Sequence, residues 1–94
     1  METLNPNNPH YVERGKLGFV CNNAILWSDS STVFWREYKG TISQGQFLLI
    51  LSEPIYFQVT AYHQRWCYKV LFEEQVYWIA VDDILNPYYI GSTS

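Results

Sequence analysis

The chain has 94 residues, and its six basic and nine acidic side chains give a formal net charge of −3 at pH 7. This length corresponds to one small domain. Hydrophobic residues make up 48% of the sequence and aromatic residues 18%, a composition that excludes intrinsic disorder. The acidic balance and the lack of a basic stripe argue against nucleic acid as a partner.

No apolar run approaches the ~18 residues that a membrane-spanning helix needs, so no membrane partner is expected. The first nine residues, METLNPNNP, lack the basic and apolar regions of a signal peptide. We therefore expect a cytoplasmic protein. In that compartment Cys21 and Cys67 are expected to be reduced thiols.

In chain order, a polar segment comes first, at residues 1–14, where two Asn-Pro pairs oppose helix formation. We expect this segment to be a flexible tail unless a hydrophobic side chain docks it, the candidates being Leu4, Tyr11 and Val12. Residues 15–90 are expected to form the folded domain. Residues 91–94 are expected to form a short flexible end.

Short runs of β-branched and aromatic residues follow, and the clearest of them, from Ile55 to Tyr62, alternates with the period of a strand. The predicted strands lie at 16–21, 24–27, 33–38, 46–52, 55–62, 66–72 and 75–80. One short helical turn is expected at 81–85, where Asp82 and Asp83 suit the start of a helix. Whether residues 54–65 form an inserted hairpin stays open at this point.

Turn-forming residues separate these runs. The predicted turns are Asn22-Asn23, Asp29-Ser30-Ser31, Lys39-Gly40, Gln44-Gly45, Ser52-Glu53-Pro54 and Glu73-Glu74. Many short strands at close spacing predict an all-β fold, either a small barrel or a sandwich. The predicted core comprises Leu26, Val33, Ile42, Phe47, Leu49, Phe57, Val59, Val70, Phe72, Ile79 and Ile84.

Three segments together carry a family resemblance. Residues 22–28 (NNAILWS) match a strand entering a long first loop, residues 40–51 (GTISQGQFLLIL) a diverging turn with its strand, and residues 67–79 (CYKVLFEEQVYWI) a late hairpin. In this order they resemble the bacterial SH3 domain (SH3b) family and the wider class of SH3-like barrels. The resemblance covers about residues 16–86 and implies a small SH3-like β-barrel.

The chain also departs from that family. Tyr77 stands where the family usually has Gly before the late Trp, and Glu73-Glu74 replaces Asn-Gly, so a longer loop or a bulge is expected there. Trp27 and Trp66 fall near two groove positions of eukaryotic SH3 domains, which bind proline-rich peptides. The Pro and Tyr that complete that groove are replaced by residues 81–85 (VDDIL), so proline-helix binding is not expected.

The sequence predicts no catalytic or metal site. Four side chains could bind zinc through nitrogen or sulfur, namely His10, His63, Cys21 and Cys67, but their spacing predicts no cluster. The apolar strand around Cys67 indicates packing rather than nucleophilic chemistry. The adjacent Asp82 and Asp83 are explained by a helical turn. We expect no cofactor and no enzyme activity.

The aromatic residues exceed what a core of this size can hold, and Tyr and Trp are enriched at interfaces. We therefore expect a non-catalytic module that binds a protein partner, or a second copy of itself, through an exposed aromatic shelf. The expected contact residues are Trp27, Asp29, Trp35, Glu37, Tyr38, Trp66 and Tyr77, with Trp27 and Trp66 as anchors. Such a module suits a subunit of a complex, or a small viral or mobile-element protein that blocks a host protein. The alternative is a small ligand or cell-wall-type glycan stacked on the aromatic rings.

Overall fold

The computed structural model describes residues 7–31, 36–58 and 64–88. The elements are β1 (Leu17–Val20), β2 (Ala24–Ser31), β3 (Arg36–Ile42), β4 (Phe47–Ile50), β5 (Ile55–Gln58), β6 (Gln64–Phe72), β7 (Gln75–Ala80), the 3-10 helix η1 (Val81–Asp83) and β8 (Ile84–Leu85). The predicted all-β class and the single helical turn near residues 81–85 are confirmed. Across the three described ranges, no helix has the length and apolar character needed to cross a membrane.

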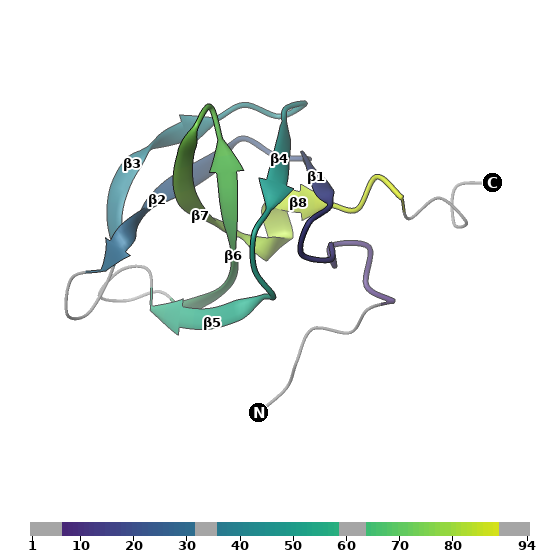
Figure 1. Ribbon diagram of the computed structural model, residues 1–94, viewed down its shortest axis with the longest axis horizontal. Helices are drawn as coiled ribbons and strands as arrows, with labels where there is room; N and C mark the ends of the chain where they lie inside the picture. The colour runs from purple at the N-terminus through teal and green to yellow at the C-terminus, as the bar shows by residue number, and fades with distance from the viewer. Residues whose placement is uncertain (1–6, 32–35, 59–63, 89–94) are drawn as a thin grey trace.

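One antiparallel sheet contains all the described strands, and it curls into a small barrel (Figure 1). The strand order is β3-β2-β7-β6-β4-β1-β8, and β5 pairs with β6. The hairpins β2–β3 and β6–β7 lie next to each other in this order. The short strand β8 returns after η1 to pair with β1, which places the end of the fold beside its beginning.

Strands β4 and β5 pair with successive parts of the same edge of β6. Ile50 faces Val70 and Ile55 faces Cys67, so residues 51–54 on one side span residues 68–69 on the other. Leu51 N donates to Lys69 O at 2.7 Å within this irregular stretch. Residues 55–58 therefore form a hairpin with the first half of β6, and this hairpin is continuous with the main sheet because the second half of β6 pairs with β4.

The core lies on the inner face of the curled sheet. Its buried side chains come from almost every strand and include Val20, Leu26, Ile42, Leu48, Ile50, Tyr68, Val70, Ile79 and Ile84. Of the predicted core, Leu26, Ile42, Val70, Ile79 and Ile84 are buried, and Phe72 packs against them half-buried. Val33, Val59 and the side chain of Phe57 lie outside the described residues.

Two of the predicted core positions, both in β4, are wrong. Phe47 is 51% exposed and Leu49 is half-buried, whereas Leu48 and Ile50 are buried. The four consecutive apolar residues of β4 give no alternation that could select the inner face. Pairing of Leu48 with Gly18 and of Ile50 with Val70 selects it instead.

Gly18 allows β1 to approach the core closely. A Cβ atom at this position would lie 2.7 Å from Ile84 Cγ2 and 3.2 Å from Ile50 Cδ1. Any larger residue would therefore have to displace these buried side chains. The glycine lets β1 sit directly between β4 and β8.

Two predicted turns are parts of strands. Residues 29–31 continue β2, and Lys39-Gly40 lies inside β3. Leu26 faces Gly40 and Trp27 faces Tyr38, so Lys39 is an extra residue that forms a bulge. Gly40 has φ of 130°, a conformation that favours glycine. Glycine signals both turns and bulges, which explains the error at Lys39-Gly40.

The Glu73-Glu74 turn also differs from its prediction. Phe72 faces Gln75 across the β6–β7 hairpin, so the loop contains only two residues. Both have positive φ, 51° at Glu73 and 68° at Glu74, as in a type I′ turn. The longer loop or bulge expected from the missing Asn-Gly is therefore wrong, because the pairing of the two strands imposes the tight turn.

The N-terminal segment that precedes β1 docks on the barrel through Val12, which is buried. The Tyr68 hydroxyl accepts a hydrogen bond from Val12 N and donates one to His10 O, both at 2.8 Å. Asn86 N also donates to Pro9 O at 2.8 Å. This segment is thus tied to β6 and to the residues that follow β8.

Candidate functional site

Three aromatic side chains form a row across β3, β2 and β7, called the aromatic row below: Tyr38, Trp27 and Trp78. Trp27 faces Tyr38 on one side and Trp78 on the other in the strand register. The Trp27 and Tyr38 rings meet edge to face, with centroids 6.5 Å apart and an interplanar angle of 78°. Because Leu26 and Ser28 are buried and side chains alternate along a strand, Trp27 projects from the outer face.

The aromatic row becomes more exposed from β7 toward β3. Trp78 is buried together with Cys67, and Trp27 packs half-buried against these two side chains. Tyr38 is 58% exposed. The buried Trp78 and half-buried Trp27 thus support the exposed phenol of Tyr38. Together they combine apolar contact area with a hydrogen-bonding group, as protein-binding hot spots do.

Three other predicted contact residues are close to this row in the chain. Asp29 lies in β2, two residues after Trp27, and Glu37 lies in β3 directly before Tyr38. The side chains of both lie outside the described part, as does the whole of Trp35. Their contribution to the surface therefore remains a prediction from the sequence.

Trp66 and Tyr77 occupy a different place from Trp27. Both pack half-buried against the main core. The Trp66 ring also contacts the exposed Tyr56, with centroids 5.5 Å apart. The structure thus brings Trp27 and Tyr38 together but places Trp27 and Trp66 in separate hydrophobic clusters.

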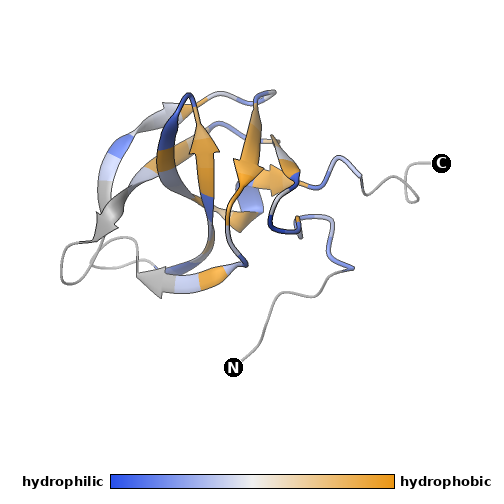
Figure 2. Cartoon of the chain, viewed as in Figure 1, coloured by the Kyte–Doolittle hydropathy of each residue, from blue (hydrophilic) through white to orange (hydrophobic). Residues whose placement is uncertain are grey.

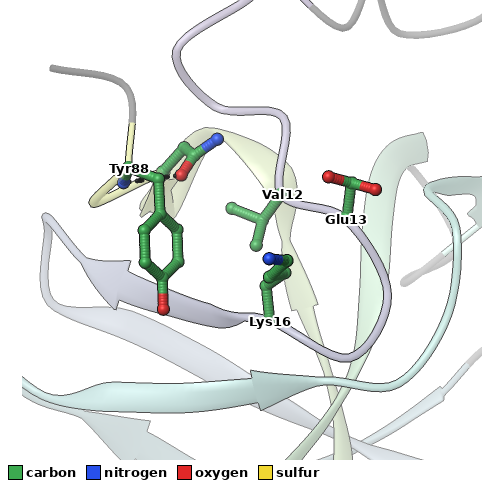
Figure 3. Close-up of a pocket in the computed structure, with 5 residues that line it drawn as sticks. Val12, Glu13, Lys16 and Tyr88 are labelled. Carbon is green, nitrogen blue, oxygen red and sulfur yellow. Dashed lines mark hydrogen bonds between the residues drawn. The ribbon is translucent and has the colours of Figure 1, made fainter.

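A shallow hollow lies between the N-terminal segment and the residues after β8 (Figure 3). Val12, Glu13, Lys16, Asn86 and Tyr88 line it, and its volume is about 70 Å³. Lys16 Nζ lies 5.5 Å from the centre of the Tyr88 ring, and Tyr88 N donates to Asn86 Oδ1 at 2.8 Å. Pockets for small organic ligands usually have ~300–1,000 Å³, so this hollow is too small for one.

The cysteines lie in unreactive surroundings. Burial, followed by the charge of Asp83, raises the pKa of the Cys21 thiol. Burial also raises the pKa of Asp83, whose carboxylate accepts a hydrogen bond from the Asn22 amide at 3.4 Å. Cys67 is fully buried, and no disulfide joins it to Cys21. A thiol with a raised pKa is a poor nucleophile at neutral pH.

Metal-binding side chains do not gather in the described ranges. Within residues 7–31, 36–58 and 64–88, no three His, Cys, Asp or Glu side chains lie close enough to hold an ion. His10 is engaged in the fold, because its Nδ1 lies 2.7 Å from Ile84 O. His63 lies outside these ranges.

A second exposed surface was missed at the sequence level. It lies on the outer face of β8, β1 and β4 and is called the outer apolar face below, comprising Leu17, Phe19, Phe47, Leu49 and Leu85. Phe47 and Leu49 had been predicted as core. The sequence feature that could have predicted this face is the uninterrupted apolar character of residues 17–20 and 47–50. A strand that packs on the core with one face only needs apolar residues at alternate positions.

Comparisons of the chain with protein-family models, with curated proteins and with solved structures found no match. The resemblance to SH3b domains, carried by residues 22–28, 40–51 and 67–79, therefore stays a prediction.

Proposed function

We propose that the protein is a non-catalytic protein-binding module and that the aromatic row is its contact surface. The observation that carries this proposal is the Trp27–Tyr38 pair, an edge-to-face contact at 6.5 Å whose outer member is 58% exposed. Trp and Tyr are the residues most enriched at binding hot spots. Support from the buried Trp78 holds the pair in place before a partner arrives, which lowers the entropic cost of binding.

The exposed rings of the row favour a partner segment with an apolar side chain, and the acidic residues near them in the sequence favour a basic residue beside it. The apolar side chain would pack on the Trp27 and Tyr38 rings. Asp29 and Glu37 are close in sequence to these rings, and the whole chain carries a charge of −3. Opposite charge on the partner would speed association and fix its orientation. The resemblance to SH3-like barrels, many of which bind peptides, adds to this proposal.

The experiment compares two exposed tyrosines. The 94-residue chain is immobilised and used to capture proteins from a lysate of its native cells, with Tyr38→Ala as the test and Tyr56→Ala as the matched control. Tyr56 is 45% exposed but lies beside Trp66, away from the aromatic row. Loss of an anchor commonly costs at least ~2 kcal/mol, or about thirtyfold in affinity. Tyr38→Ala is therefore expected to lose the partner that wild type and Tyr56→Ala retain.

Capture of the same partner by Tyr38→Ala at unchanged affinity would contradict the proposal. Equal loss in both variants would also contradict it, since the contact would not then lie on the aromatic row. Thermal unfolding of each variant checks that it is folded. A rise in unfolding temperature with oligosaccharides, abolished by Tyr38→Ala, would instead assign the row to glycan stacking.

A further inference from the structure

Strands β1 and β4 are apolar on both faces, although only one face packs on the core. Their sequences are LGFV and FLLI, and β8 adds IL. An antiparallel strand with one face in water normally alternates apolar and polar residues. Continuous apolar runs are typical of strands that are covered on both sides. The pattern indicates that the outer apolar face is covered in the working protein.

The five side chains of this face adjoin one another across three neighbouring strands. Phe19 faces Phe47 on one side and Leu85 on the other, and Leu17 faces Leu49. The Phe19 and Phe47 rings meet edge to face with centroids 5.3 Å apart. Leu17 is 44% exposed and Phe47 is 51% exposed. In Figure 2 the ribbons of β1, β4 and β8 are largely orange and lie together at one side of the barrel.

We propose that a second copy of this chain covers the outer apolar face, which makes the protein a symmetric dimer. Two sheets pack face to face at about 10 Å when both inner faces are apolar, with their strands within about 30° of each other. A two-fold axis through the face would place the Phe19–Phe47 pair of one copy against the same residues of the other. Such isologous contacts are the commonest way in which identical chains associate.

The lack of ionisable side chains on this face is compatible with a second copy as the occupant. None of the five side chains is ionisable, although the chain has nine acidic and six basic residues. Two chains that each carry a net charge of −3 can therefore meet at this face without burying like charges. A charged partner segment would find no counter-charge among these side chains. An identical neutral face is the complementary surface that every molecule of this protein already carries.

The area suits a weak and reversible dimer. Leu17 and Phe47 are about half exposed and each leave roughly 100 Å² in water, and Phe19, Leu49 and Leu85 are less exposed, so the face presents on the order of 300–400 Å² of apolar surface. A standard interface buries about 800 Å² per partner, and its apolar core is surrounded by a polar rim. The outer apolar face supplies such a core. We expect a dissociation constant in the micromolar range, so that the fraction of dimer depends on the protein concentration.

The test is sedimentation velocity of the full chain from low to high micromolar concentration. Phe47→Glu and Leu17→Glu each place a charge on the face, and both sites are exposed enough to tolerate it in the monomer. Ile55→Glu is the matched control, because Ile55 is 43% exposed and lies on β5. We expect the wild type and Ile55→Glu to dimerise alike, and the other two variants to dimerise at least about tenfold more weakly.

A wild type that stays monomeric at the highest concentration overturns the proposal, and so does equal weakening in all three variants. Filtered nuclear Overhauser spectra of a mixed labelled and unlabelled sample give a second measurement that needs no variant. Contacts between the Phe47 ring of one copy and the Phe19 or Leu17 side chain of another are expected. Contacts confined to other surfaces would overturn the assignment. Both results are independent of partner capture by the aromatic row.

Discussion

Tyr68 links the core to the N-terminal segment through its hydroxyl group. The side chain is fully buried, and its oxygen serves both Val12 N and His10 O at 2.8 Å. A buried backbone N–H without a hydrogen-bond partner costs roughly 1–3 kcal/mol. The Tyr68 hydroxyl supplies the partner that a neighbouring strand would supply if this segment were part of the sheet. One tyrosine thereby holds the segment that packs Val12 into the core.

The same burial predicts how stability depends on alkaline pH. Burial raises the pKa of Tyr68 to about 12, above its ordinary value near 10. The unfolded chain therefore ionises this tyrosine first, and the folded state loses stability as pH rises from about 10 to about 12. Two pKa units correspond to roughly 2–3 kcal/mol. We expect Tyr68→Phe to be less stable than wild type at neutral pH but to lose less stability across this alkaline range.

Chemical unfolding at several pH values measures this difference. The wild-type curve is compared with that of Tyr68→Phe and with that of the exposed control Tyr38→Phe. Tyr38→Phe should follow the wild type. Parallel curves for wild type and Tyr68→Phe between pH 10 and 12 would show that Tyr68 is not a buried, neutral bridge.

Single residues were partly predictable from the sequence. Tyr38 is among the contact residues predicted from the sequence, and its side chain is 58% exposed. Trp78 is buried, which the sequence did not indicate. The bridge made by Tyr68 could not be foreseen, because its partners lie more than fifty residues earlier in the chain. Such pairings depend on the folded topology rather than on local pattern.

At the scale of the element, the β6–β7 hairpin has a strained turn. Glu73 and Glu74 both have positive φ, where residues other than glycine are disfavoured by roughly 1–2 kcal/mol each. Type I′ turns strongly prefer Asn-Gly. The double substitution Glu73→Asn with Glu74→Gly is expected to stabilise the protein by about 1–2 kcal/mol, after allowance for the greater entropy of glycine in the unfolded chain.

The control for this turn replaces the charges without changing the backbone preference. Glu73→Gln with Glu74→Gln removes both carboxylates, and we expect it to change the free energy of unfolding by less than about 0.5 kcal/mol. Denaturant unfolding of both double variants gives the answer. An equal gain in the two would assign the effect to charge, and no gain from Asn-Gly would contradict the two-residue turn.

The inner face of β6, whose residues alternate, was predicted well, and that of β4, whose residues do not, was not. In β6, Tyr68 and Val70 point inward with Lys69 between them, as the sequence pattern indicates. Residues 47–50 are all apolar, so either face could have been the inner one. The bulge at Lys39 was not separable from a turn, because the glycine that follows suits both. The register with neighbouring strands determines which face of β4 is buried and where β3 bulges. This register depends on the whole sheet and cannot be read from one strand.

At the scale of the whole molecule, the two surfaces lie on different parts of one sheet. The aromatic row crosses β3, β2 and β7, whereas the outer apolar face covers β8, β1 and β4 at the other end of the strand order. A dimer built on the second surface would keep both aromatic rows available. Each dimer would then present two partner sites, which raises the effective affinity for a partner that carries repeated motifs.

Composition predicted an aromatic contact surface but not where on the sheet it lies. The surplus of aromatic residues pointed to an interface, and Trp27 with Tyr38 belonged to the expected set. Their contact across β2 and β3 depends on the bulge at Lys39, which sets which residues face each other. The outer apolar face was not predicted, because Phe47 and Leu49 were assigned to the core. A shift of one residue along a strand moves every side chain to the other face.

The inner and outer faces of β4 can be told apart by one pair of unfolding measurements. The structure buries Leu48 and leaves Leu49 half-buried on the outer face. Leu48→Ala is expected to lower the free energy of unfolding by roughly 2–4 kcal/mol through loss of buried contacts and a cavity. Leu49→Ala, measured at a concentration where the chain is monomeric, should lower it by less than about 1 kcal/mol. The reverse order would turn Phe47 and Leu49 into the core, and the outer apolar face would not exist.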